Sequence, residues 1–354
     1  MLARRRFFDR RRFLARLIAS LVVCLAVAPS VGLAEMVYAT SFSEGSLIRF
    51  DSSDPIGTAT TILGNGTFSS PTGLAFGSDG HLYVGVTGDF ATIGPTIARV
   101  DLSDNSVTTA FTFAASDVFP AALVFEGNDL LVGRNSFFGN TGPIVQLANL
   151  IGGSPIQSDY TTGGGLASSP GLARSGNGTL YVADQTYNPS PPGNATGPVK
   201  RFDAVGNYVG EVITDGQSGG SPPNDWQLLG PTGLAIAGDT LYTASIMNGQ
   251  ILATDVTTDT TSLFASTGLP FGTGPLALLG NGQLLSGDPS GFYNSIFHFD
   301  TDGTLIGSYA LGLGQVGGIT VAPVPEPGTL ALVGIGLAAG AALLRRRRRA
   351  TMAA

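Results

Sequence analysis

PTGLAFGSDGHLYVGV, residues Pro71–Val86, is the stretch that decides the fold. It begins with small residues, continues with a short apolar run and a Gly-containing turn, and ends in a strand of alternating apolar and polar residues, a pattern typical of a β-hairpin. Related phrases return at Pro120–Gly133, Pro170–Asp184, Pro231–Ser245 and Pro275–Asp288. Because a single hairpin cannot bury its apolar face alone, this recurrence indicates stacked repeats.

The spacing of the repeats indicates their architecture. Alignment on the leucine of the GLA phrase gives Leu74, Leu123, Leu172, Leu234 and Leu276, with Ile319 in register in a degenerate sixth copy. The resulting intervals of 49, 49, 62, 42 and 43 residues suit four-stranded propeller blades of about 40–50 residues. We label the strands of each blade a to d, with GLA in strand a and LYV in strand b.

The two ends of residues 35–322 complement one another. After position 34 the chain reads MVYATSF, SLIRFD and ATTIL, which are strands b, c and d without a strand a. The last repeat, near Ile319, is a strand a with nothing after it. We therefore predict an all-β, six-bladed β-propeller in which the N- and C-terminal strands share one blade. A seven-bladed ring, a β-sandwich and an open solenoid are the alternatives, and the two half-blades argue against the last two.

Residues 1–34 are predicted to be a signal peptide. Arg4–Arg6 and Arg10–Arg12 form a basic region, Leu17–Ala28 an apolar one, and Ala34 ends a small-residue cleavage site. Residues 10–14 resemble the twin-arginine export signal, and this route and general secretion both stay open. Cys24, the single cysteine, would be lost on cleavage, leaving neither a disulfide nor a thiol nucleophile.

The C-terminal end has three parts. Residues 323–328 contain Pro325, Glu326 and Pro327, residues 329–344 are apolar, and residues 345–354 begin with five arginines. We expect a linker, a transmembrane helix and a cytoplasmic tail, in that order. The arrangement closely resembles the PEP-CTERM sorting signal, and a plain tail anchor is the alternative. The resemblance implies processing by an exosortase, transient anchoring in the inner membrane of a Gram-negative bacterium, and a final place in the cell envelope or an extracellular polysaccharide matrix.

The charge of the body argues against polyanionic partners. Twelve of the 18 basic residues lie in the two terminal segments, which leaves six against 23 acidic residues in positions 35–324, a net charge near −17. Such a surface repels nucleic acid and anionic membranes.

Loop length distinguishes the two ends of the predicted ring. Neighbouring strands in a blade run antiparallel, so the a–b and c–d turns lie at one end and the b–c and d–a connections at the other. The first set is short and the second long, for example 185–198 and 215–231. We call the second end the long-loop face and expect ligands to bind there. The C-terminal strand should leave the ring at the opposite end, so that this face points away from the membrane.

Acidic and aromatic residues gather in the loops of this face. The candidate ligand-binding residues are Asp89, Phe90, Phe137, Phe138, Asp184, Tyr187, Asp225, Trp226, Asp288, Phe292 and Tyr293. Aromatic rings stack on apolar ligand faces such as sugar rings, which favours a glycan ligand, although the same rings could instead attach the loops to the rim. The carboxylates could hold Ca²⁺ weakly or cap turns. We assign no catalytic residue and no cofactor.

The repeated phrase, LYVAD at Leu180–Asp184 above all, resembles NHL-type propellers and the related gluconolactonase-like family. That resemblance implies a divalent metal in the channel, held by Asn or Asp just before the Gly-Leu of strand a. This sequence has Thr72, Ala121, Pro170, Thr232, Gly317 and Gly274-Pro275 at those places, so we predict no metal site. His81 and His298 lie on different blades and predict neither a zinc site nor a catalytic triad.

Two hypotheses for function follow. The favoured one is a non-enzymatic binding or structural protein at the cell surface. The alternative is a hydrolase or lyase acting on a sugar lactone or polysaccharide. The lining of the channel distinguishes them: three or more Asp, Glu, Asn or His side chains around an ion would favour the enzyme.

Overall fold

A computed structural model describes residues 34–89, 94–114, 119–135, 142–188, 194–222 and 224–323. The signal peptide, the Pro-Glu-Pro motif and the predicted membrane helix at 329–344 lie outside these ranges. Within them, no helix has the length and apolarity needed to cross a membrane.

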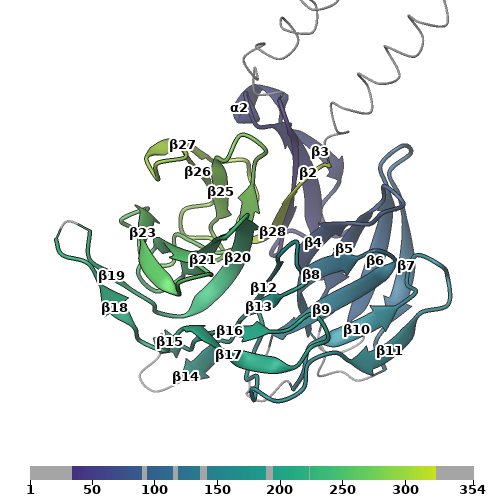
Figure 1. Cartoon of the computed structure of the whole chain (residues 1–354). Coiled ribbons are helices and arrows are strands. Elements are labelled where there is room, and N and C mark those ends of the chain that lie inside the picture. Colours follow the sequence, from purple (N-terminus) through teal and green to yellow (C-terminus); the bar gives the residue numbers. More distant parts are fainter. Residues whose placement is uncertain are drawn as a thin grey trace, which may run out of the picture. The chain divides into compact units, whose positions relative to one another are not determined.

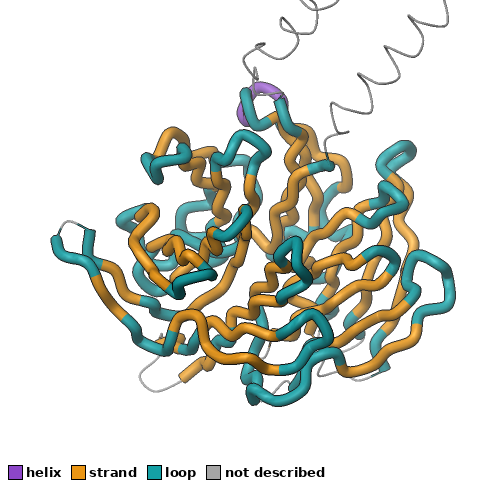
Figure 2. Tube along the Cα trace, in the orientation of Figure 1, coloured by secondary structure: helices purple, strands orange, loops and turns teal. Residues whose placement is uncertain are grey.

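Six four-stranded antiparallel sheets make up the body (Figures 1 and 2). The first three blades in chain order are blade 1, β4 (Pro71–Phe76), β5 (Leu82–Val86), β6 (Thr96–Asp101) and β7 (Ser106–Thr112); blade 2, β8 (Phe119–Glu126), β9 (Asp129–Asn135), β10 (Val145–Ala148) and β11 (Ile156–Asp159); and blade 3, β12 (Gly171–Arg174), β13 (Leu180–Ala183), β16 (Val199–Phe202) and β17 (Tyr208–Ile213). Each contains one copy of the repeated phrase in its first two strands.

The remaining blades complete the ring. They are blade 4, β20 (Pro231–Ala237), β21 (Thr240–Ser245), β22 (Gln250–Asp255) and β23 (Thr260–Ser266); blade 5, β24 (Leu276–Leu278), β25 (Leu284–Gly287), β26 (Ile296–Phe299) and β27 (Leu305–Tyr309); and blade 6, β28 (Val316–Val321), β1 (Met36–Ser41), β2 (Ser46–Asp51) and β3 (Thr60–Leu63). A four-residue helix, α2 (Pro55–Thr58), joins β2 to β3.

Blade 6 is assembled from both ends of the body, as predicted. Val37 pairs with Val321, Tyr38 with Thr320 and Ala39 with Ile319 in an antiparallel ladder between β1 and β28. This pairing closes the ring through backbone hydrogen bonds, and it confirms the six-bladed propeller.

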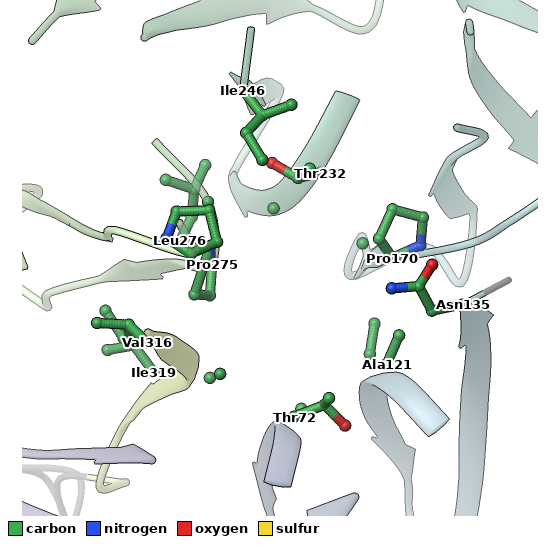
Figure 3. Close-up of a pocket in the computed structure, with 18 of the residues that line it drawn as sticks. Thr72, Ala121, Asn135, Pro170, Thr232, Ile246, Pro275, Leu276, Val316 and Ile319 are labelled. Carbon is green, nitrogen blue, oxygen red and sulfur yellow. The ribbon is translucent and has the colours of Figure 1, made fainter. Parts of the chain in front are cut away.

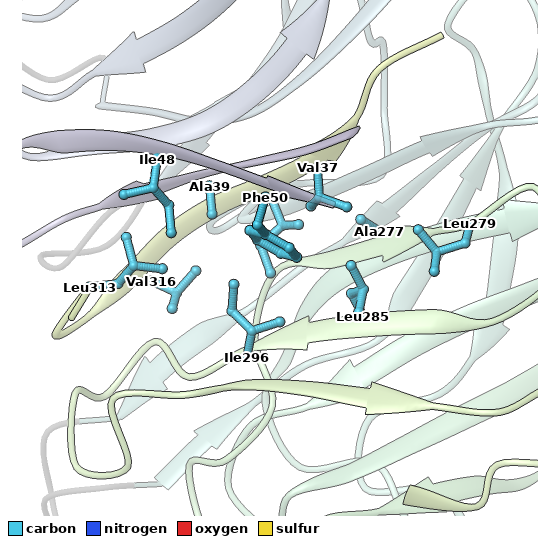
Figure 4. Packing of buried hydrophobic residues seen from close by; sticks show 11 residues of the cluster. Val37, Ala39, Ile48, Phe50, Ala277, Leu279, Leu285, Ile296, Leu313 and Val316 are labelled. Carbon is cyan, nitrogen blue, oxygen red and sulfur yellow. The ribbon is translucent and has the colours of Figure 1, made fainter. Parts of the chain in front are cut away.

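The core is divided among the interfaces between blades. Each of six apolar clusters joins two neighbouring blades, and none serves the whole ring. Figure 4 shows one of them, where Val37, Ile48 and Phe50 of blade 6 meet Leu285 and Ile296 of blade 5. The alternating pattern of strands b and c supplies these side chains, because residues on one strand point alternately to the two faces of a sheet.

Two long loops carry additional β-structure. The b–c connection of blade 3 forms the ribbon β14 (Thr186–Asn188) and β15 (Asn194–Thr196). The d–a connection before blade 4 forms β18 (Ser218–Gly219) and β19 (Trp226–Gln227).

Candidate functional site: a charge-free channel

The strands a of the six blades lie innermost and contact one another around a central channel. A cavity of about 540 Å³ occupies the part of the channel nearest the long-loop face (Figure 3). Its lining comes from the first residues of the strands a and from b–c and d–a connections, and no lining residue belongs to an a–b or c–d turn. The cavity therefore belongs to the long-loop face.

Two local features turn the start of strand a toward the channel. In blades 1, 2 and 4 a β-bulge interrupts the register just after the strand's proline, as between Pro71 and Leu74, and bulges bend a strand. A glycine then allows the neighbouring blade to approach. A Cβ on Gly171 would lie 1.7 Å from the carbonyl oxygen of Thr232, and one on Gly233 would lie 2.1 Å from that of Gly274. In blades 3 and 4, contact with the neighbouring blade therefore leaves no room for a side chain at the glycine of the repeated phrase.

The lining is neutral. None of the described residues around the cavity is Asp, Glu, Lys, Arg or His. The positions that carry metal ligands in gluconolactonase-like propellers do reach the cavity, and Thr72, Ala121, Pro170, Thr232 and Gly317 occupy them as the sequence indicated. Across the described ranges as a whole, no three His, Cys, Asp or Glu side chains are grouped to hold one metal ion.

The polar groups of the lining are amides and hydroxyls. Thr72 uses its hydroxyl within the protein, since it donates to the Pro120 and Gly85 carbonyl oxygens. The buried hydroxyl oxygen of Thr232 has no hydrogen-bond partner among the described residues. Asn135, Gln185 and Gln315 contribute side-chain amides.

Phe271 contributes an aromatic ring to the lining and has an unusual backbone. Its φ of 62° lies in the left-handed region, which costs a bulky residue about 1–3 kcal/mol. The amide of Phe271 donates to the Ile246 carbonyl at 2.7 Å, and the Tyr293 hydroxyl donates to the Pro270 carbonyl at 3.1 Å. These bonds hold the strained loop at the channel. Strain of this kind is common in ligand clamps.

Two of the carboxylates singled out in the sequence are internal. Asp184 is 3% exposed and pairs with Lys200, which is also buried and whose Nζ lies 2.5 Å from Oδ2. The backbone amides of Ala167 and Ser168 donate to Asp184 Oδ1, and Lys200 also donates to the carbonyl oxygens of Gly164 and Gly165. The pair therefore fixes the d–a loop at 160–169.

Asp288 has the same kind of role in blade 5. It is fully buried, and its two oxygens accept hydrogen bonds from the Ser290 hydroxyl and from the backbone amides of Ser290, Gly291, Tyr293 and Asn294. This carboxylate organises the loop at 289–294. Asp89 and Asp225, by contrast, are exposed.

The aromatic candidates divide in a similar way. Trp226 is 6% exposed and packs in the cluster between blades 3 and 4, with its indole over Gly219. Tyr293 is half-buried. Phe292 is 78% exposed, and its ring centre lies 6.4 Å from that of Phe271. Phe90, Phe137, Phe138 and the side chain of Tyr187 lie outside the described parts of the chain.

Sequence reasoning missed Phe271, Asn135 and Gln185. The last two share a repeat position with three other lining residues, because the fifth residue after the first apolar residue of LYV reaches the cavity in five blades. These residues are Phe42, Asn135, Gln185, Ile246 and Pro289. Alignment of the repeats on strand b, rather than strand a, would have found them. No comparable signal marks Phe271, which lies in a d–a loop of irregular length.

The opposite end of the ring holds a different group of titratable residues. Around Asp79, hydrogen bonds come from His81 N, the Tyr83 hydroxyl and Arg99 Nε. Burial raises the pKa of Asp79, but these donors outweigh it and the pKa is lowered overall. Burial and the bond to Asp79 raise the pKa of Tyr83 to about 12. The group ties an a–b turn to strand c.

The C-terminal strand leaves the ring at this opposite end, as expected. The amide of Ala322 donates to the Met36 carbonyl, and the neighbouring Glu35 accepts from Gly280 in the a–b turn of blade 5. Trp226, in contrast, belongs to the long-loop face. The sorting segment therefore begins on the side with the short turns.

Residues 323–349 match the family described as the PEP-CTERM protein-sorting motif. The chain carries this sorting signal at its C-terminal end. The PEP-CTERM signal implies an exported, cell-surface-sorted protein that is processed by an exosortase, in agreement with the sequence analysis. It covers 27 residues and gives no information on the activity of the body.

Solved structures share the fold of the body at low identity. A chain of the nidogen/laminin complex aligns with a TM-score of 0.61 at 14% identity, covering 82% of this chain and 98% of its own. TolB from Acinetobacter baumannii aligns with a TM-score of 0.55 at 16% identity, covering 84% and 68%. No curated protein matches the sequence. These likenesses support the propeller fold and nothing further.

Proposed function

We propose that this chain is an exported, non-enzymatic binding protein that recognises an uncharged polysaccharide at the cell envelope or in the extracellular matrix. The PEP-CTERM signal supports the address. The observation that carries the proposal is the channel cavity, which has the volume of a small-ligand site, about 300–1,000 Å³, and a lining without a charged side chain among the described residues.

The lining favours binding over catalysis. Glycoside hydrolysis uses a pair of carboxyl groups, and lactone or ester chemistry needs a base or a metal-activated water. The described lining offers hydroxyls, amides and apolar groups instead. The buried carboxylates nearest the long-loop face, Asp184 and Asp288, are saturated with internal hydrogen bonds.

Electrostatics favours a neutral polymer over an acidic one. The body has a net charge near −17, and five of its six basic residues form internal ion pairs: Arg99, Arg134, Arg174, Lys200 and Arg201. An acidic polysaccharide would therefore be repelled by the surface as a whole. A neutral polymer experiences no such repulsion.

The long-loop face would point away from the membrane while the C-terminal segment is intact. This follows from the exit of β28 at the end with the short turns. A polymer outside the cell would then meet the open side of the channel first.

The test is a binding screen with the full chain purified in detergent. Neutral glucose, mannose and galactose oligosaccharides and acidic hexuronate oligosaccharides are compared by calorimetry, with and without EDTA. Binding of a neutral oligosaccharide, unchanged by EDTA, is expected. Binding of acidic oligosaccharides alone, or turnover of any of them, would contradict the proposal.

A further inference from the structure

The geometry points to a two-sided site in the channel that takes one terminal or branch unit of a neutral polysaccharide. We call Asn135 and Gln185 the amide wall, and Ile246, Phe271, Pro275 and Leu276 the apolar wall. Figure 3 shows Asn135, with Pro170 and Ala121 beside it, across the cavity from Pro275 and Leu276. This inference rests on the proposed function and specifies where and how the sugar is held.

The side-chain amides of the amide wall have hydrogen-bonding groups that the described residues leave unused. Asn135 accepts a bond from the Ser168 hydroxyl through Oδ1 at 3.0 Å, and its Nδ2 has no partner among the described residues. The side chain of Gln185 makes no hydrogen bond within the same part of the chain. Asn135 and Gln185 are only partly buried, so the free amide groups of both side chains can donate to or accept from a polar ligand in the cavity.

The apolar wall requires the same ligand to have an apolar face. Phe271 is held at the cavity in a left-handed backbone conformation, and the exposed Phe292 lies next to it. Ile246 and Leu276 extend this surface into the channel. A wholly polar ligand would leave these side chains in contact with water or with unsatisfied polar groups.

A neutral sugar unit satisfies both walls. Its hydroxyls donate and accept at once, as side-chain amides do, and its ring carbons present C–H groups to an aromatic plane. A lipid tail would leave the amide wall unpaired, and an acidic sugar would find no cation among the described lining residues. Because strands surround the cavity on all sides, a polymer enters through an end or a branch.

The experiment uses the full chain in detergent and the neutral oligosaccharides of the screen. Gln185→Ala and Phe271→Ala are each expected to weaken binding by about fivefold to tenfold, since one hydrogen bond or one aromatic contact is lost. Gln157→Ala and Tyr208→Ala are the matched controls, because Gln157 is exposed on β11 and Tyr208 on β17, away from the channel. They are expected to stay within about twofold of wild type.

A second variant separates folding from binding. Phe271→Gly relieves the backbone strain while it removes the ring, so it should be at least as stable as Phe271→Ala and bind as weakly. Neutral binding that survives all three channel substitutions would overturn the two-sided site and leave the proposed function standing. No binding of any neutral saccharide, or binding of an uncharged peptide instead, would overturn both.

Discussion

Gly171→Ala tests the contact between blades that the repeated phrase encodes. Gly171 begins strand β12, and its φ is not in the left-handed region, so alanine causes no backbone strain. The added Cβ would, however, lie 1.7 Å from the Thr232 carbonyl oxygen and 3.2 Å from Leu234 N. The steric overlap therefore opposes, and outweighs, the small stabilisation that Gly→Ala gives by restricting the unfolded chain.

The size of the effect follows from the overlap. Non-bonded atoms pack at about 3.5–4.0 Å, so β12 and β20 must separate by more than 1 Å. Both belong to apolar clusters that join neighbouring blades, and overpacking of this kind costs about 1–3 kcal/mol. We expect a loss near the upper limit, about 3 kcal/mol in the free energy of unfolding, and a fall in Tm of about 6–12 °C.

Differential scanning calorimetry and urea denaturation measure this loss. Gly176→Ala, in the a–b turn of the same blade, is the matched control, because its Cβ would have no atom within 4 Å. It should change stability by at most about 1 kcal/mol, in the stabilising direction. If Gly171→Ala unfolds at the same temperature as Gly176→Ala, the close-approach argument is refuted.

Three further outcomes are expected. Lys200→Met leaves Asp184 buried without its cation and should lower the free energy of unfolding, measured by urea denaturation, by about 3–5 kcal/mol. Adding Asp184→Asn to this variant should recover part of the loss. A Lys200→Met variant as stable as wild type would contradict the internal role of the pair. Burial lowers the pKa of His298 despite the nearby Asp300, so the unfolded chain binds more protons than the folded one. The stability contributed by neutral His298 is therefore lost as pH falls through about 6.5 and below. His298→Gln should reduce the pH dependence of the thermal unfolding midpoint between about pH 7.5 and pH 5.5. Trp226→Ala should lower the free energy of unfolding by about 3–5 kcal/mol and leave the affinity for neutral oligosaccharides unchanged. Lost affinity at unchanged stability would instead show that Trp226 contacts the ligand.

Periodic and local signals allowed the architecture to be predicted. The recurrence of GLA and LYV gave the blades, because it depends on patterns within one hairpin. The strand a near Ile319 and the strand b at Met36 gave the closure, because each is an incomplete copy of the same repeat. The sorting signal around Pro325–Pro327 is likewise contiguous. In the sequence, glycine at positions such as Gly171 is only part of a motif. The structure explains it, because a backbone carbonyl of the next blade occupies the place where a side chain would lie.

The candidate site depended on contacts between distant segments. From the sequence, Asp184 and Asp288 could hold Ca²⁺ or cap turns. The structure buries both: Asp288 accepts from its own loop at 289–294, and Asp184 accepts from the d–a loop at 160–169 and from Lys200. Trp226 could be a stacking platform or an anchor for its loop, and it packs in a core cluster. The channel takes its lining from all six blades, and only the closed ring brings these residues together. Burial, and with it the free or occupied state of each polar group, is set by neighbours far away in the sequence, which is why the tertiary structure alone decided the chemistry of this site.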